Sequence, residues 1–303
     1  MSPIKAFLAL TTRDNDYQRA QAASAEAMAR QFGVELEIAY ANNDAVYQIE
    51  QILTAIQRRD HDIGIVITQP TGTGMVNVAE TAAKSGVAWA LLSREVDYIA
   101  PLRAKYQVPV FEVSVDQPEI GHIQAQQIAA IVPGGGTVLY LTGPASGSSP
   151  RLRADGLAAK KPANIELKVI RGNWTDESGY RAVSSWLKLS TSKSSGFSAV
   201  ISQNDAMAVG ARRAFSEIND STERAHWMQL PILGCDGLPE TGQQYIRRGL
   251  LTSTVVTPPV AGLALELFVK WKTQGVVIPD RTLATSTSFP ALAALHPKVM
   301  GQK

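Results

Sequence analysis

Short apolar segments alternate with segments of helical spacing along almost the whole chain, and this alternation strongly restricts the possible folds. Apolar runs such as 4–10 and 63–68 are long enough for a buried strand and too short for a helix. A segment such as 17–32, with apolar residues at helical spacing, follows each run. Parallel strands need crossover connections, which are usually helices. The alternation therefore predicts an α/β fold with doubly wound parallel sheets.

The alternation runs in two similar series, each with about five predicted strands. A turn at Pro133-Gly-Gly-Gly136 separates them. Residues 97–109 break the rhythm of the first series, and we interpret them as an insertion. The second series ends with a helix at 260–273 and a last strand near 283–288. Two similar series predict two lobes.

Composition excludes several classes of protein. A length of 303 residues is sufficient for two domains, and 45% hydrophobic with 18% charged residues is ordinary for a globular protein. A net charge of +2 gives no reason to expect nucleic acid or an anionic membrane as a partner. The single cysteine, Cys235, excludes an internal disulfide, and its strand-like context predicts a buried, inert thiol. No apolar run is long enough to span a membrane as a helix.

The motifs expected of an enzyme are missing. The four histidines lie far apart without metal-ligand spacing, so we predict no metal site. No phosphate-binding loop is present, and Gly72-Thr-Gly74 lacks the third glycine of a dinucleotide fingerprint because Asn77 stands there. Residues 143–147 do not form a nucleophile elbow. We therefore expect no cofactor and no catalysis.

A strand that turns directly into a helix places polar side chains in the second series. Residues 199–202 form an apolar run, Asn204 and Asp205 follow, and apolar residues recur near helical spacing over 206–215. Ligands of open α/β folds bind at the carboxyl edge of the sheet, where such junctions lie. Taken alone, Asn204 and Asp205 are better explained as helix caps, because capping is the common use of these residues.

A second junction follows at residues 230–240, where Gly234-Cys235-Asp236-Gly237 ends a predicted strand. Together, Gln203-Asn204-Asp205-x-Met207-Ala208 and this Gly-x-Asp-Gly segment resemble motifs of the periplasmic sugar-binding proteins of the ribose-binding type. These proteins share their fold with the ligand domains of the lactose-repressor family. The resemblance extends from about residue 4 to about residue 278.

The resemblance implies two lobes with a hinge and a ligand cleft between them, the fold of type I periplasmic binding proteins. It assigns residues 1–113 and 257–281 to an N-terminal lobe, with the last long helix crossing back to it. Residues 114–256 and 282–303 then form a C-terminal lobe.

In the first lobe, the resemblance implies ligand contacts by Asp14, Tyr17 and Arg94. Ordinary packing at a helix start is an equal explanation for Tyr17. Gln18 replaces a second aromatic residue of the family, and Ser93 replaces an aspartate. The loss of the carboxylate at Ser93 argues against ribose itself as the ligand.

In the second lobe, the resemblance implies contacts by Arg151, Trp174, Asn204, Asp236 and Thr257. Arg153 follows Arg151 at i+2, and we interpret it as structural. Trp174 follows Gly172-Asn173, which marks a loop, so ligand stacking is favoured over a core position. Carboxylates, amides and guanidinium groups can pair with sugar hydroxyls, while an indole suits the apolar face of a sugar ring.

The resemblance therefore implies a protein that captures a small neutral sugar or polyol and delivers it to an ABC transporter permease. A chemoreceptor or sensor kinase is an alternative partner. We expect a monomer in the periplasm or another extracytoplasmic space, although the chain as given starts without a signal sequence. Two other functions stay open: the ligand domain of a repressor, and a transferase that uses a phosphosugar or nucleotide held by Arg94 and Arg151.

Overall fold

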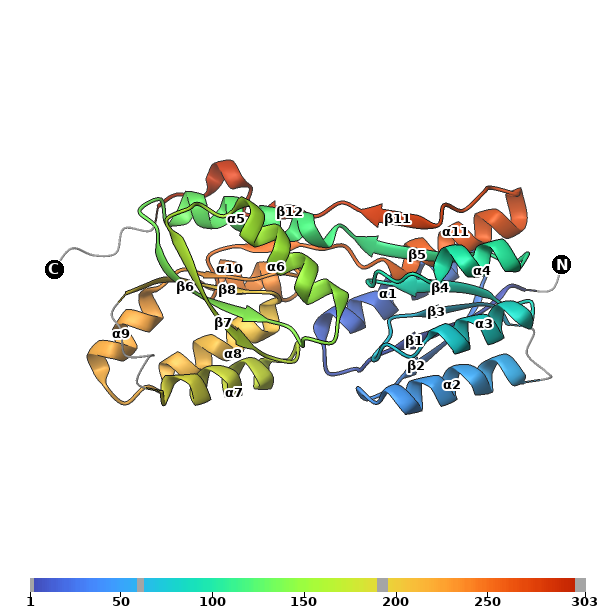
Figure 1. Ribbon diagram of the computed structural model, residues 1–303, viewed down its shortest axis with the longest axis horizontal. Helices are drawn as coiled ribbons and strands as arrows, with labels where there is room; N and C mark the ends of the chain where they lie inside the picture. Colours follow the sequence, from blue (N-terminus) through green and yellow to red (C-terminus); the bar gives the residue numbers. More distant parts are fainter. Residues whose placement is uncertain (1–2, 59–62, 190–195, 298–303) are drawn as a thin grey trace. The chain divides into compact units, whose positions relative to one another are not determined.

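The computed structural model describes residues 3–58, 63–189 and 196–297 (Figure 1). Contacts divide the chain into two compact units. The first runs to Val115 and includes Ser146–Ser149 and Pro259–Ala284. The second contains Asp116–Ala145, Pro150–Pro258 and the chain from Thr285 onward.

The first unit is built on a six-stranded sheet with the order β11-β5-β4-β3-β1-β2, in which all strands are parallel. Its strands are β1 (Lys5–Leu10), β2 (Glu35–Tyr40), β3 (Ile63–Thr68), β4 (Ala88–Leu92), β5 (Val110–Val115) and β11 (Arg281–Ala284). Its helices are α1 (Asp16–Phe32), α2 (Ala45–Gln57), α3 (Val76–Lys84), α4 (Ile99–Lys105) and α11 (Ala261–Gln274). This parallel sheet with crossover helices is the doubly wound arrangement that the sequence predicts.

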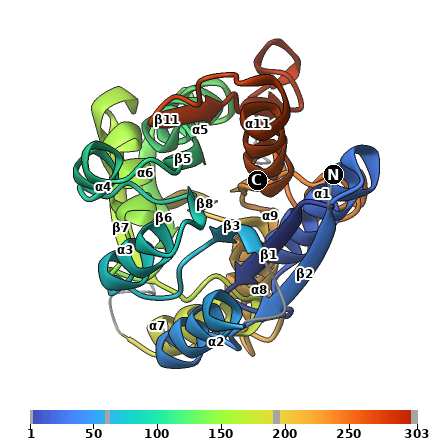
Figure 2. The ribbon, with the colours of Figure 1, turned by 90° about the vertical axis from the view of Figure 1, so that its right-hand side faces the viewer.

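Helices cover both faces of this sheet. Figure 2 shows α1 and α11 on one face and α2, α3 and α4 on the other. Strand residues are buried on both sides, as the near-continuous burial of β1 and β4 shows. Helix α11 packs closely on α1, where a Cβ at Gly262 would clash with the backbone of Ser24. The side chain of Gln21 accepts hydrogen bonds from the amides of Val260 and Ala261, both at 2.8 Å, and so satisfies donors at the start of α11.

The second unit contains a four-stranded parallel sheet with the order β7-β6-β8-β9 and an antiparallel pair, β10-β12. Its strands are β6 (Gly136–Thr142), β7 (Ile165–Arg171), β8 (Phe197–Ser202), β9 (Ile232–Leu233), β10 (Thr254–Val256) and β12 (Thr287–Phe289). Its α-helices are α5 (Gln117–Ile131), α6 (Ser148–Lys160), α7 (Asp176–Leu187), α8 (Asp205–Ser216), α9 (Ser221–Gln229) and α10 (Gly242–Arg247). A 3-10 turn, η2, spans Leu292–Ala294.

Two apolar clusters hold this unit together, one on each face of the sheet. Helices α5 and α6 contribute to one cluster, and α7, α8 and α9 contribute to the other. The second cluster contains four packed aromatic rings, and the Phe215 and Trp227 rings stack with centroids 4.7 Å apart. Trp186 meets Phe197 and Trp227 edge-on at 5.3 and 5.5 Å. This aromatic cluster fixes α7, α8 and α9 against the sheet.

Four features differ from the sequence prediction. Residues 97–109 are not an insertion, because α4 lies there as the ordinary crossover between β4 and β5. The predicted single strand at 283–288 is two strands: β11 pairs with β5, whereas β12 pairs with β10. Helices α9 and α10 are additional. The units divide after 115, 258 and 284, whereas the sequence suggests boundaries after 113, 256 and 281; the pairing of β11 with β5 explains the last difference.

Candidate functional site

The predicted site residues all follow the carboxyl ends of strands. In the first unit, Asp14 and Tyr17 follow β1, and Arg94 follows β4. In the second unit, the strands β6, β7, β8, β9 and β10 are followed in turn by Arg151, Trp174, Asn204, Asp236 and Thr257. Because the main sheet of each unit is parallel, the carboxyl ends of its strands share one edge. Strand β10 reaches the same edge through parallel bridges, Leu233 with Ser253 and Asp236 with Val256. This edge is where open α/β sheets bind ligands.

Asp14 and Tyr17 flank the start of α1. Asp14 is exposed and Tyr17 is half-buried. Asn15 is the N-cap of the helix, and its Oδ1 accepts from the Gln18 amide at 3.1 Å. Gln18, where the resemblance implies an aromatic residue, is buried, and its Oε1 accepts from the Thr11 amide at 3.0 Å. The buried Gln18 side chain therefore orders the loop between β1 and α1.

Arg94 is half-buried, and its Nη2 donates to the Pro70 carbonyl at 3.2 Å. Burial lowers the pKa of Arg94 below its ordinary value, but a guanidinium stays protonated in proteins. The neighbouring Ser93 is buried and has a positive φ of 56°. The Ser93 carbonyl accepts from Ser149 Oγ at 2.7 Å.

Asn204 and Trp174 are brought together in the second unit. Asn204 is 2% exposed, its Oδ1 caps α8 by accepting from the Met207 amide at 3.0 Å, and its Nδ2 donates to the Trp174 carbonyl at 2.8 Å. Trp174 is half-buried, has φ of 66°, and covers Gly143, where a Cβ would clash with the indole. The predicted capping role of Asn204 is confirmed, and it is combined with a contact to the Trp174 loop.

Asp236 and Thr257 also lie together. Asp236 is 9% exposed and has φ of 110°, and its carbonyl accepts from the Thr257 amide at 3.0 Å and from Thr257 Oγ1 at 3.4 Å. Thr257 is 1% exposed, so its hydroxyl faces the Asp236 backbone instead of solvent. The adjacent Cys235 is fully buried, and burial raises the pKa of its thiol to about 12, which agrees with the predicted inert thiol.

The two arginines of α6 lie in different environments. The Arg151 side chain is 65% exposed, and its Nη1 lies 3.3 Å from Asp155 Oδ2. Arg153 is 8% exposed, and its Nη1 donates to the Gln203 carbonyl at 2.5 Å and to Cys235 Sγ at 3.5 Å. The Arg153 guanidinium also lies 5.7 Å from the centre of the Trp174 ring. Arg153 therefore belongs to the same cluster as Trp174.

Buried polar residues that the motif analysis does not single out as contacts connect these loops. Gln203 Nε2 donates to Tyr140 Oη at 2.7 Å and to the Pro150 carbonyl at 2.8 Å. Its Oε1 accepts from the Gly143 amide at 2.9 Å. Asp205 is 3% exposed and bonds to the loop after β9. Their place in the motif, directly before and after Asn204, is the only sequence feature that could have indicated these roles.

Two other features are absent from the part of the chain that the structure describes. Within residues 3–58, 63–189 and 196–297, no three His, Cys, Asp or Glu side chains are grouped so that they could hold a metal ion. No helix in the described part of the chain combines the length and apolar character that crossing a membrane requires.

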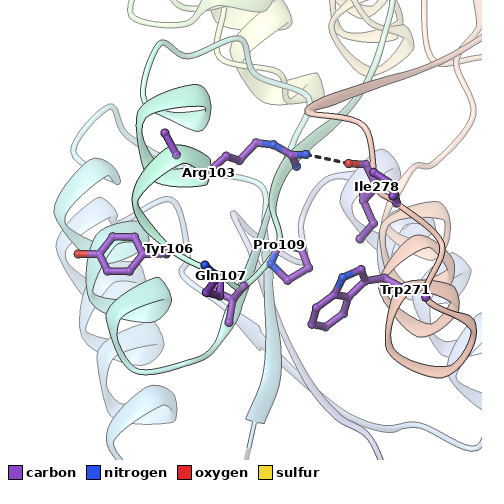
Figure 3. A pocket seen from close by; sticks show the side chains of 10 residues that line it. Arg103, Tyr106, Gln107, Pro109, Trp271 and Ile278 are labelled. Atoms are coloured by element: carbon purple, nitrogen blue, oxygen red, sulfur yellow. Dashed lines mark hydrogen bonds between the residues drawn. The ribbon is translucent and has the colours of Figure 1, made fainter.

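A separate pocket of about 320 Å³ lies at the opposite, amino edge of the first unit's sheet. Pro109, just before β5, and Trp271 of α11 line it together with Arg103. Figure 3 shows the Arg103 guanidinium reaching the Ile278 carbonyl, at 3.0 Å, and Arg103 also donates to the Val110 carbonyl at 3.0 Å. None of the predicted site residues lines this pocket.

Comparison with known proteins decides the family. Residues 6–267 match the family described as "Periplasmic binding protein domain". The chain belongs to this family of periplasmic binding proteins. Its doubly wound parallel sheets agree with this family, as the sequence resemblance predicts.

Three relatives place this periplasmic binding protein more closely. A Rhizobium meliloti protein named for rhizopine binding is 29% identical over 197 residues, which cover 63% of this chain and 60% of that protein. The D-apiose import binding protein of Actinobacillus succinogenes is 23% identical over 250 residues, 82% of this chain and 74% of that protein. A solved ABC transporter periplasmic solute binding protein of A. succinogenes 130z, with bound D-allose, has a TM-score of 0.78 at 20% identity, covering 94% of this chain and 96% of that one. At this identity, the structural likeness establishes the fold.

Proposed function

We propose that this periplasmic binding protein binds a small neutral sugar or polyol and delivers it to the permease of an ABC transporter. The ligand contacts come from Asp14, Tyr17 and Arg94 in the first unit, and from Arg151, Trp174, Asn204, Asp236 and Thr257 in the second. The protein acts as a monomer outside the cytoplasm and catalyses no reaction. The two units are the two lobes that the sequence resemblance implies.

One observation carries the proposal: an indole, an amide and a guanidinium lie together at the carboxyl edge of the second unit. The Trp174 carbonyl accepts from Asn204, and the Trp174 ring lies beside Arg153. A sugar presents both an apolar C–H face and a rim of hydroxyl groups. An indole can stack on the face, while charged and amide groups pair with the rim at about 1.5–3 kcal/mol for each bond to a charged group.

The charges at these edges favour a neutral ligand over an anion. Arg94 and Asp14 follow strands of the first sheet, whereas Arg151, Arg153, Asp205 and Asp236 follow strands of the second. Positive and negative groups are therefore nearly balanced in number. A phosphosugar would meet carboxylates as well as guanidinium groups, which reduces the gain from its charge.

The relatives support the transport role and the location. One relative from A. succinogenes is named a D-apiose import binding protein. The solved structure from the same species is named an ABC transporter periplasmic solute binding protein. Delivery by a periplasmic binding protein requires a state that the transporter recognises. Hinge closure around the ligand supplies such a state when both units make ligand contacts that exist only in the closed form of the protein.

A thermal-shift screen tests the proposal. The protein is heated with D-xylose, D-apiose, D-allose and myo-inositol, with glucose 6-phosphate as the anionic control. A ligand at 100 times its Kd adds about 2.7 kcal/mol of stability, which is a readily measured rise in Tm. We expect at least one neutral compound to raise Tm and to reduce the radius of gyration in X-ray scattering. A response to the phosphosugar alone would instead support the transferase function.

A further inference from the structure

Asn204 and Asp205 are consecutive residues at the start of α8, and each reaches a different neighbouring loop. We infer that this pair is a positioning device: Asn204 holds the loop of Trp174, and Asp205 holds the loop of Asp236. The inference rests on the proposed function, because Trp174 and Asp236 are two of the proposed ligand contacts. It adds a role for Asp205 and a second role for Asn204.

Asp205 is bonded to the loop after β9 through its backbone and its side chain. Its amide donates to the Cys235 carbonyl at 2.6 Å. Its Oδ2 accepts from the Gly237 amide at 2.8 Å, and its Oδ1 accepts from Thr254 Oγ1 at 2.7 Å. Asp205 thus bonds to the residues on either side of Asp236, and through Thr254 it also holds β10.

The space around the Asp205 carboxylate is closely shaped. A Cβ at Gly234 would clash with its Oδ1, and a Cβ at Gly242 would clash with its Oδ2. Two glycines from different segments therefore make room for one carboxylate. Such a close fit holds the carboxylate in one position. The Gly237 amide, which donates a hydrogen bond to this carboxylate, is therefore fixed as well.

Asn204 makes the corresponding contact in the opposite direction along the sheet. Its Nδ2 donates to the Trp174 carbonyl at 2.8 Å, while its Oδ1 remains occupied by the α8 cap. Strand β8 lies between β6 and β9 in the sheet, and Trp174 follows β7 beyond β6. The end of β8 is therefore well placed to reach loops in both directions.

Both held residues have strained backbones. Trp174 has φ of 66° and Asp236 has φ of 110°, values that residues other than glycine rarely adopt. Such conformations persist only where surrounding bonds enforce them. The bonds from Asn204 and Asp205 contribute to that enforcement, beside the backbone bonds that Asp236 makes to Val255 and Thr257. Without them, the indole and the carboxylate would leave the geometry proposed for ligand contact.

NMR spectroscopy of the ligand-free protein tests the two contacts separately. In D205A, we expect hydrogen exchange of the Gly237 amide to accelerate by at least about tenfold while amides of β6 and β8 keep their protection. D205N retains one oxygen for the Gly237 amide, and its NH₂ can donate to the Thr254 hydroxyl, so it should restore most of the protection. In N204S, a hydroxyl still caps α8 but the donor to Trp174 is lost, so the Trp174 indole resonance should shift and the Gly237 amide should not.

D220A is the matched control, because Asp220 caps α9 through the Glu223 amide and touches neither loop. The inference is wrong if folded D205A keeps normal exchange at Gly237, or if N204S leaves the Trp174 resonance unchanged. It is also wrong if D205A and D205N lower protection throughout β6 and β8, because Asp205 would then be a general core residue.

Titration with D-xylose and with myo-inositol connects the device to binding. Whichever of these compounds binds the wild-type protein should bind D205A at least about tenfold more weakly. The double variant D205A/D236A should lose less binding free energy than the sum of the losses in D205A and D236A. Additive losses would contradict the positioning role. If neither compound binds the wild type, the proposed function is in doubt, whereas the exchange experiment still decides the role of Asp205.

Discussion

Arg151 and Arg153 lie two positions apart on α6, yet Arg151 is exposed beside Asp155 while Arg153 is buried beside Trp174. A helix turns by about 100° per residue, so positions i and i+2 point to nearly opposite sides. The sequence resemblance implies ligand contact by Arg151 and a structural role for Arg153. The structure gives Arg153 both a structural environment and a place beside a proposed ligand contact.

Substitution of the two arginines separates these roles. R151A removes an exposed i,i+4 ion pair worth about 0.3–0.5 kcal/mol, so its Tm should hardly change. R153A leaves the buried Gln203 carbonyl and Gln117 Oε1 without this donor, which costs about 1–3 kcal/mol of stability. If Arg151 binds the sugar, R151A lowers affinity about ten- to hundredfold by calorimetric titration. An unchanged affinity in R151A would remove Arg151 from the site.

Trp174 and Trp186 form a matched pair of tryptophans in the second unit. Trp186 is 5% exposed within the aromatic cluster, so W186A should lower the free energy of unfolding by about 3–5 kcal/mol. Trp174 is half-buried at the sheet edge, so W174A should cost less than about 2 kcal/mol but should weaken sugar binding. Chemical denaturation and titration of both variants check this. A W174A variant as unstable as W186A, with normal binding, would place Trp174 in the core.

Glu112 on β5 makes stability depend on pH. The residue is 4% exposed; burial raises the pKa of its carboxyl to about 7, although Arg281 Nε lies 3.3 Å from Glu112 Oε1. A raised pKa means that the folded state holds the proton more tightly than the unfolded chain. The Glu112 contribution therefore grows as pH falls from about 7 toward the unfolded value, and its charged form destabilises the fold above pH 7.

E112Q removes this dependence. We compare the free energy of unfolding of E112Q with that of the wild type at each pH. The difference, E112Q minus wild type, should be larger at about pH 8 than at about pH 5, by up to about 3 kcal/mol. Urea unfolding of both proteins at several pH values measures the difference. A difference that stays constant with pH would show that Glu112 titrates near its ordinary value.

Much of the fold could be predicted because alternating apolar runs and helical segments are local patterns. The pattern locates β1 and β3 with the helices after them, and it also locates β4. It cannot locate β11 and β12, since each has only a few residues and is defined by its partner strand. It misses α4 because Pro101 and a short apolar span look like an interruption.

The candidate site was less predictable from the residues alone. The motif around Asn204 points to the carboxyl edge of the sheet, but Asn204 alone is indistinguishable from a simple cap. Buried glutamines such as Gln18 and Gln203 read as ordinary polar residues in the sequence, and only the folded chain shows which backbone groups they satisfy. The positive φ of Trp174 also carries no sequence signature, because it is enforced by neighbouring loops.

Calorimetric titration at two ionic strengths tests the central claim most directly. The neutral sugar or polyol that gives the largest thermal shift is titrated at low and at high salt, beside its phosphorylated counterpart. Because the charges at the sheet edges nearly balance and the ligand is neutral, we predict saturable one-to-one binding with an affinity that changes little with salt. Failure of every neutral sugar and polyol to bind, or tight binding of the phosphorylated compound that falls steeply with salt, would contradict the account.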